Sequence, residues 1–260
     1  MLEINSKTNK TYKMLAALRT KKGRSEHGLY AVEGLKSVRE ALTYASKVTA
    51  LALTRSIADE NPDLVSEAER CGVAVYLLSE ELFAKISDTQ TPSGVLCAIA
   101  LPQAVKPQTR GGLYIYCDHI ADPGNAGTII RTADAVGASA VWFSPESVDI
   151  YNPKVIRSTM GSFFHIETCT DVPPAQLKCA AQDGYSLIAG ALSPTATDAR
   201  ALTMPKDTVL VIGNESNGIS DEVLALCKTH AILPIVGKAE SLNAATAAAV
   251  FMYKWLFEQK

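Results

Sequence analysis

Three short polar segments contain the side chains of this sequence that could do chemistry. In chain order they read Asn125-Ala-Gly-Thr-Ile-Ile-Arg131, Gly213-Asn-Glu-Ser-Asn-Gly218 and Ser241-Leu-Asn243. Each segment follows an apparent strand, and the ligand sites of open α/β proteins gather where strands end. Amide, carboxylate, hydroxyl and guanidinium groups at such places could orient a substrate and stabilise a developing charge.

The first segment predicts a helix over about 127–137. Pro123 and Gly124 make a turn before it, and Gly127 lets backbone come close to a ligand or a neighbouring helix. Arg131 lies four residues beyond Gly127, so it projects from the same face one turn deeper. Alone, this segment is more typical of a capped helix with a surface pair of Arg131 and Asp134.

The second segment has the glycine spacing of a phosphate-binding loop but lacks the other features of one. Its glycine spacing matches a P-loop, but Ile219 stands where the P-loop lysine should be, and Glu215 would put a carboxylate among phosphate oxygens. A dinucleotide site is also poorly supported, because no G-x-G-x-x-G pattern is present. The loop therefore favours a neutral or cationic ligand. A helix cap at Ser220 is the structural alternative, and it leaves Glu215 unexplained.

The third segment places Ser241 and Asn243 at the mouth of an alanine-rich helix. The alanines leave that helix nearly smooth, so neighbouring backbone can pack closely against it. Alone, a capped core helix of small residues explains this segment better than a site does.

Alternating patterns predict the elements that must position the three segments. In residues 1–104 we expect strands at 29–32, 48–53, 73–77 and 95–100, and helices at 12–18, 36–44, 62–70 and 80–86. Two prolines and a glycine pair indicate a linker at 105–112. In residues 113–260 we expect strands at 113–117, 140–143, 165–169, 186–190, 208–212 and 230–233, and further helices at 153–160, 173–183, 220–228 and 242–257. This alternation predicts a mostly parallel sheet with helices on both faces, preceded by a small α/β domain.

Composition limits the class of protein. The 260 residues, 47% of them apolar, suffice for one large domain or two ordinary ones. No apolar run approaches the roughly 20 residues that span a bilayer, and the first residues lack the apolar stretch of a signal peptide, so we expect a cytoplasmic protein. The six cysteines form no C-x-x-C motif. Buried reduced thiols are therefore expected, with neither disulfides nor a metal.

Positive charge gathers near the N-terminus. Residues 7–24 hold seven basic side chains and no acidic one, although the net charge of the chain is −2. Such a face can attract a phosphate backbone. A solvated basic helix with a basic loop explains the same residues equally well.

Taken together, in order and spacing, the three segments strongly resemble the SpoU/TrmH-type RNA 2′-O-ribose methyltransferases of the SPOUT superfamily. The three structural alternatives would have to coincide in register to explain this match. The resemblance implies a deep trefoil knot in a SPOUT methyltransferase domain at 113–260 and a homodimer formed through that domain. It also implies a ribosomal-protein-like RNA substrate-binding domain at 1–104, where 30–34 and 89–100 carry the weaker match.

The resemblance further implies the cofactor and the reaction. S-adenosylmethionine would bind at Ala191, Gly213, Gly218, Leu233, Ile235 and Leu242. Its cationic sulfonium agrees with a carboxylate at Glu215. Its methyl group would pass to a ribose 2′-hydroxyl, in ribosomal RNA more than in transfer RNA. The basic residues that would bind the RNA are Lys7, Lys10, Arg19, Lys21, Lys22 and Arg24.

Family analogy gives Arg131 the central catalytic role. Because a guanidinium has a pKa above about 12 and rarely loses its proton, we interpret Arg131 as binding the adjacent phosphate and stabilising the alkoxide. The residues that would orient Arg131 and the ribose are Asn125, Glu215, Ser241 and Asn243. Two alternatives remain: a knotted RNA-binding module without catalysis, and a small-molecule enzyme on an ordinary doubly wound sheet.

Overall fold

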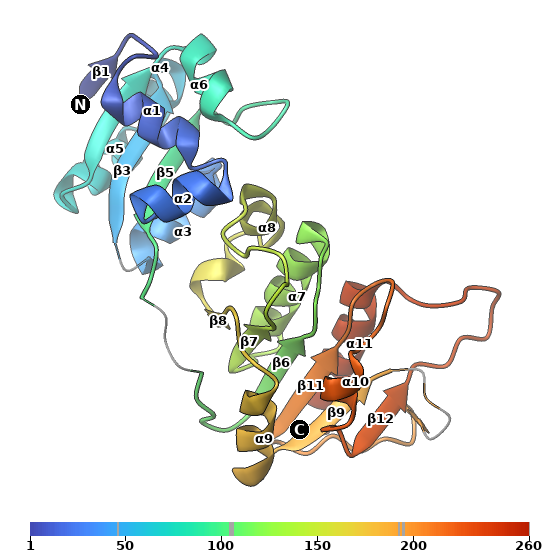
Figure 1. Cartoon of the computed structure of the whole chain (residues 1–260). Helices are drawn as coiled ribbons and strands as arrows, with labels where there is room; N and C mark the ends of the chain where they lie inside the picture. Colours follow the sequence, from blue (N-terminus) through green and yellow to red (C-terminus); the bar gives the residue numbers. More distant parts are fainter. Residues whose placement is uncertain (46, 104–106, 192, 194–195, 260) are drawn as a thin grey trace. The chain divides into compact units, whose positions relative to one another are not determined.

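The computed structural model describes residues 1–45, 47–103, 107–191, 193 and 196–259. The chain forms two compact units (Figure 1). The first comprises Met1–Gln103 and Tyr151–Phe164, and the second comprises 104–150 and 165–260. Positions 105 and 106 of the expected linker lie outside the described residues.

The first unit is built on a mixed five-stranded sheet. Its strand order is β1-β4-β3-β5-β2, with β1, β4 and β3 parallel and β5 antiparallel to both β3 and β2. The strands are β1 (Leu2–Ile4), β2 (Leu29–Glu33), β3 (Val48–Thr54), β4 (Ala74–Leu78) and β5 (Val95–Ala100). The helices are α1 (Lys10–Ala17), α2 (Lys21–His27), α3 (Leu35–Tyr44), α4 (Arg55–Glu60), α5 (Pro62–Arg70), α6 (Glu80–Ile86) and α8 (Pro153–Ser158), followed by the 3-10 turn Ser162–Phe164. β1, α2 and α4 were not expected: β1 and α4 are too short for a periodic apolar pattern, and α2 contains no apolar side chain beyond glycine.

The second unit contains a seven-stranded sheet in the order β10-β12-β9-β11-β6-β7-β8. Every strand pair in it is parallel, which confirms the expected mostly parallel sheet. The strands are β6 (Leu113–Cys117), β7 (Ala140–Phe143), β8 (Glu167–Cys169), β9 (Ser186–Gly190), β10 (Thr197–Asp198), β11 (Thr208–Ile212) and β12 (Thr229–Ile232). The helices are α7 (Pro123–Ala135), α9 (Ala175–Gln182), α10 (Asp221–Leu224) and α11 (Ala244–Glu258).

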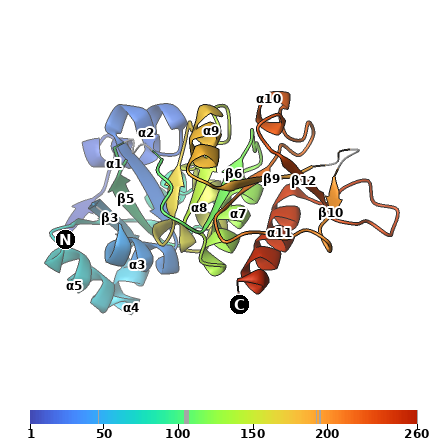
Figure 2. The ribbon, with the colours of Figure 1, turned by 90° about the horizontal axis from the view of Figure 1, so that it is seen from below.

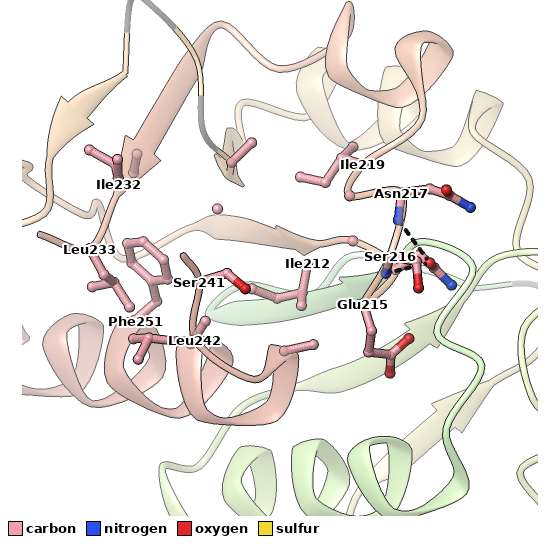
Figure 3. A pocket seen from close by; sticks show the side chains of 18 of the residues that line it. Ile212, Glu215, Ser216, Asn217, Ile219, Ile232, Leu233, Ser241, Leu242 and Phe251 are labelled. Atoms are coloured by element: carbon pink, nitrogen blue, oxygen red, sulfur yellow. Dashed lines mark hydrogen bonds between the residues drawn. The ribbon is translucent and has the colours of Figure 1, made fainter. Parts of the chain in front are cut away.

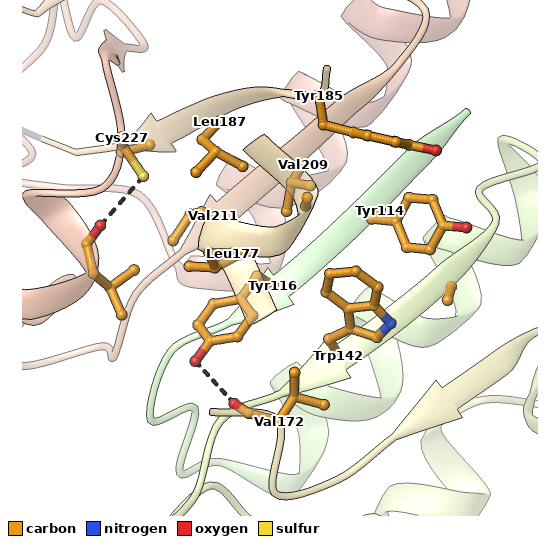
Figure 4. Close-up of a cluster of buried hydrophobic side chains, with 14 of the residues drawn as sticks. Tyr114, Tyr116, Trp142, Val172, Leu177, Tyr185, Leu187, Val209, Val211 and Cys227 are labelled. Atoms are coloured by element: carbon orange, nitrogen blue, oxygen red, sulfur yellow. Dashed lines mark hydrogen bonds between the residues drawn. The ribbon is translucent and has the colours of Figure 1, made fainter. Parts of the chain in front are cut away.

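Helices cover both faces of this parallel sheet. α7 and α11 pack against each other on one face, whereas α9 and α10 lie on the other (Figure 2). The core beneath α9 and α10 is aromatic (Figure 4): the ring centroids of Tyr114 and Trp142 lie 4.7 Å apart, and the Tyr116 hydroxyl donates to the Val172 carbonyl at 3.0 Å. Apolar side chains on both faces of the sheet exclude water there, so the polar groups lie at the strand ends.

The expectation of buried thiols holds for four of the six cysteines, whereas Cys71 and Cys179 are exposed. All six are free, and Cys97, Cys117, Cys169 and Cys227 are buried. Burial raises the pKa of the Cys97 thiol to about 12. Within the described part of the chain, no helix is long and apolar enough to cross a membrane.

The helix that carries the first polar segment starts earlier than predicted. α7 begins at Pro123, because the Asp122 carboxylate accepts a hydrogen bond from the backbone N–H of Asn125 at 2.8 Å and caps the helix. Proline is favoured at the first helical position, where its missing N–H costs nothing. Pro123 and Gly124 are therefore part of the helix, and Asn125 lies in its first turn. α10 is also shorter than the expected 220–228 helix, since it ends at Leu224.

Candidate active site

A cavity of about 520 Å³ opens at the carboxyl ends of β9, β11 and β12 (Figure 3). Its walls are the ends of β9 and β12, the loop after β11, and the loop after β12 with the start of α11. The six residues expected to bind the cofactor all line it: Ala191, Gly213, Gly218, Leu233, Ile235 and Leu242. Glu215, Glu240, Ser241 and Phe251 also line the cavity, which combines apolar side chains with two carboxylates.

The loop after β11 is a tight turn that requires glycine. Asn214 and Gly218 exchange two backbone hydrogen bonds, at 2.8 and 2.9 Å. A Cβ at Gly213 would lie 2.3 Å from the Gly218 carbonyl carbon, so any side chain there would push the loop apart. The Asn214 side chain also accepts hydrogen bonds from the backbone N–H groups of Ser216 and Asn217. The turn thus fixes the backbone of Glu215, and the role of Asn214 was not foreseen from the sequence.

Three of the expected catalytic residues form one hydrogen-bonded chain. The Nδ2 of Asn125 donates to Oε1 of Glu215 at 2.6 Å. The Nδ2 of Asn243 donates to Oδ1 of Asn125 at 2.8 Å, while its own Oδ1 caps α11. The chain therefore joins all three polar segments. Ser241 lines the cavity beside it.

Arg131 lies exposed on α7, six positions after Asn125. It makes no hydrogen bond or ion pair with any described residue, so the surface pair with Asp134 does not form. Instead, Oδ2 of Asp134 lies 3.3 Å from Nδ1 of His165. The guanidinium of Arg131 is available to a group from outside the chain.

The electrostatic surroundings of the cavity are acidic. Burial raises the pKa of the Cys117 thiol, and the carboxylates of Glu215 and Asp118 raise it further. No cluster of metal-binding side chains occurs among the residues that the structure describes. The excess of carboxylate charge favours a cationic ligand over a phosphate.

Five of the six residues expected to bind RNA are exposed in the first unit, and one is not. Arg24 is only 4% exposed, and its Nη1 donates to the Leu18 carbonyl at 2.9 Å. Its inclusion in an RNA-binding face was wrong, because α2 turns this side chain inward. A basic residue outside the predicted stretch joins the others: Lys85 lies against Lys7 and lowers the pKa of its ammonium group. The Nη1 of Arg19 donates to the carbonyl of the same Lys85 at 3.1 Å.

The chain matches the SpoU rRNA methylase family model over residues 112–253 and the MRM3-like substrate binding domain model over residues 9–97. The first match covers more than half of the chain. This chain belongs to the SpoU rRNA methylase family. The resemblance found in the three segments is thereby confirmed. Tyr151–Phe164 lies within the span matched by the methylase model and yet packs in the first compact unit.

Two curated relatives are similar to this SpoU-family chain over nearly its whole length. The 23S rRNA (guanosine(2553)-2′-O)-methyltransferase RlmP of Bacillus subtilis is 32% identical, covering 97% of this chain and 98% of its own. The 23S rRNA (uridine(2479)-2′-O)-methyltransferase of Streptomyces viridochromogenes is 26% identical, with 96% and 90% covered. An AdoMet-bound rRNA methyltransferase from Sinorhizobium meliloti superposes with a TM-score of 0.86 at 30% identity, covering 97% of this chain and 96% of that one.

Proposed function

We propose that this chain transfers a methyl group from S-adenosylmethionine to a ribose 2′-hydroxyl of ribosomal RNA. The hydrogen-bonded chain of Asn243, Asn125 and Glu215 beside the cavity carries this proposal. Two relatives are named for this reaction on 23S rRNA, and a structural neighbour is described as bound to AdoMet. These names favour ribosomal RNA over transfer RNA.

The residues of the cavity fit this cofactor. The apolar side chains of Leu233, Ile235 and Phe251 offer a surface for an adenine ring, and Gly213 and Gly218 leave room for backbone contact. The Glu215 carboxylate, which would repel a phosphate, suits a sulfonium cation. When bound, S-adenosylmethionine supplies a methyl group that is already activated for transfer.

The protein then has to position the ribose and manage the charge of its 2′-oxygen. Asn125 uses its donor for Glu215 and its acceptor for Asn243, so the amide has a fixed orientation. Arg131 binds the phosphate beside the target ribose and stabilises the alkoxide while that phosphate accepts the proton of the 2′-hydroxyl. Ser241 faces the same cavity and orients the ribose or the cofactor.

The first unit binds the RNA through an exposed basic face. Lys7, Lys85 and Arg19 come together there, and the pKa of Lys7 is lowered because its close neighbour is another ammonium group. Because Lys85 also pairs with Oε1 of Glu81 at 2.5 Å, the charge left to attract an anionic partner such as a phosphate is chiefly that of Lys7 and the other exposed lysines. Lys10, Lys21 and Lys22 extend the face.

The assembly is a homodimer formed through α11, and the methyltransferase part is knotted. Val250, Tyr253 and Phe257 are 45%, 40% and 66% exposed and recur along one side of this helix. A second copy of the chain is the occupant that such a self-complementary apolar stripe suits. The resemblance carried by the three polar segments supports the trefoil knot, and the family-model match over 112–253 supports a methyltransferase domain at 113–260. A cytoplasmic location stays a prediction.

Mapping of 2′-O-methylated positions tests the function. Ribosomal RNA from cells with and without this gene should differ at one ribose, and the purified protein with S-adenosylmethionine should restore that methyl group on the unmodified RNA. A protein that binds the RNA but restores nothing would instead be the knotted RNA-binding module. The presence of all five expected polar residues in the sequence argues against that alternative.

A further inference from the structure

Two consecutive residues at the carboxyl end of β6 hold both ends of the loop that carries Glu215. The backbone carbonyl of His119 accepts a hydrogen bond from Nδ2 of Asn214 at 2.8 Å. The Oδ2 of Asp118 accepts one from the backbone N–H of Ser220 at 2.7 Å. The two residues that follow β6 therefore hold the loop at both ends, where it leaves β11 and where it enters α10.

Both Asp118 and His119 lower the stability of the fold. Asp118 is 1% exposed, and its Oδ1 has no hydrogen-bond partner among the described residues; Nδ1 of His119 lies 3.4 Å from that oxygen. A buried carboxylate with so few partners destabilises the fold, so its presence here points to a task other than stability. His119 has a φ of 53°, which residues other than glycine rarely adopt. Strained residues of this kind cluster at functional sites, where the backbone must be held in one conformation.

We propose that Asp118 is a positioning residue of the methyl-transfer site, acting through Ser220 on the loop 213–220. By fixing the end of this loop, it keeps the cavity wall between Gly213 and Gly218 in shape and holds Glu215 within reach of Asn125. This inference rests on the proposed function, because the loop matters for activity only if the cavity binds S-adenosylmethionine. Asp118 itself is not part of the cavity wall, so its effect is indirect.

Asp118→Ala and Asp118→Asn separate this role from general stability. The alanine variant loses the acceptor for Ser220, whereas the asparagine variant retains one through its side-chain oxygen. Asp207→Ala is a matched control, because Oδ1 of Asp207 also accepts a backbone N–H, that of Gly112 at 2.7 Å, at the opposite end of the same sheet. The measurements are the dissociation constant for S-adenosylmethionine by calorimetry, single-turnover methyl transfer, and the melting temperature.

Asp118→Ala should weaken cofactor binding about tenfold or more, the equivalent of about 1.4 kcal/mol, and slow the transfer as well. Asp118→Asn should restore most of the affinity, and Asp207→Ala should lower only the melting temperature. Wild-type affinity in Asp118→Ala, or equal losses in both Asp118 variants, would overturn the proposal. Failure of the wild-type protein to bind the cofactor would count against the proposed function instead.

Ser220→Pro gives a second route if Asp118→Ala does not fold. Ser220 has a φ of −62°, a value that proline adopts, and this change removes the donor N–H and puts a ring carbon in its place, which breaks the contact with the Asp118 carboxylate while residue 118 stays Asp. It should weaken cofactor binding as Asp118→Ala does. Unchanged affinity in Ser220→Pro would show that the contact does not position the loop.

Discussion

The Nδ2 of Asn243 donates to Oδ1 of Asn125 at 2.8 Å and so joins the starts of two helices whose capping and first-turn residues lie 118 positions apart. The same Asn125 amide donates to Glu215 at 2.6 Å. An amide that uses its oxygen and its nitrogen in this way cannot rotate by 180° without losing both contacts. The three polar segments therefore act as one unit. Loss of the Asn243 donor should disturb the segments that carry Asn125 and Glu215.

Asn243→Asp should uncouple this unit without unfolding α11. The carboxylate can still accept from the backbone N–H groups of Ala245 and Thr246, as the amide does at 3.0 and 3.2 Å, but it cannot donate to Asn125. We expect kcat to fall about 100-fold or more, as when a preorganised donor is removed from an active site. Transfer of labelled methyl from S-adenosylmethionine and thermal unfolding measure the two effects.

Asn9→Asp is the matched control for that change. Asn9 caps α1 in the first unit in the same way, accepting from Thr11 and Tyr12. This variant should keep both its activity and its melting temperature. A large drop in the melting temperature of Asn243→Asp would contradict the separation of the cap from the active-site contact.

Arg131→Ala should abolish methyl transfer and leave cofactor binding nearly intact. Its guanidinium is exposed and makes no hydrogen bond or ion pair with any other residue that the structure describes, so its removal costs the fold little. Arg131→Lys should retain part of the activity, because lysine can bind a phosphate but cannot form two parallel hydrogen bonds to it. Arg200→Ala removes another exposed guanidinium, one already paired with Asp198, and should leave transfer unchanged. Equal losses of transfer and of cofactor affinity in Arg131→Ala would show that its role is misassigned.

Much of the fold could be predicted because its signals are local. The apolar run Val209–Ile212 is buried on both sides, as a central parallel strand must be, and the polar segment that follows it ends the run sharply. The order and spacing of the three segments then indicated the family, and the expected cofactor residues do line one cavity.

Other features depend on packing that no local pattern encodes. The burial of Arg24 follows from the orientation of α2, and the approach of Lys85 to Lys7 joins residues 78 positions apart in the sequence. The contact between Asp118 and Ser220 spans 102 positions in the same way. By contrast, the predicted helix start at Gly127 was an avoidable error, since Asp122 followed by Pro123 is a typical cap and first helical residue.

Gly213→Ala should close the cavity wall and weaken cofactor binding. The added Cβ would lie 2.4 Å from the backbone nitrogen of Ile219, so the loop must open. We expect binding to weaken more than about tenfold, because backbone has to move and not merely a flexible side chain. Gly237→Ala is the control, since nothing lies within 4 Å of a Cβ built there. Calorimetric titration of both variants with S-adenosylmethionine distinguishes them, and equal affinities would refute the requirement for glycine.

Lys7→Gln combined with Lys85→Gln should weaken RNA binding and reduce its salt dependence. Each neutralised phosphate contact contributes about 0.9 to the slope of log affinity against log salt for a duplex, so loss of two contacts should lower the slope by about 2. Affinity for S-adenosylmethionine, measured without RNA, should not change. Lys178→Gln, an exposed lysine of the second unit, serves as the control. An unchanged salt slope in the double variant would remove this face from the RNA-binding surface.

Alkaline pH should destabilise the first unit through Cys97. Burial raises the pKa of this thiol to about 12, whereas the pKa of a cysteine in the unfolded chain is about 8.5. Between these values the folded state binds more protons than the unfolded state, so the free energy of unfolding falls as pH rises, by up to about 1.4 kcal/mol per pH unit. Cys97→Ala should lose that slope between pH values of about 9 and 11 in urea unfolding, and Cys71→Ala, which removes an exposed thiol, should keep it. Identical slopes in wild type and Cys97→Ala would mean that the thiol ionises without unfolding.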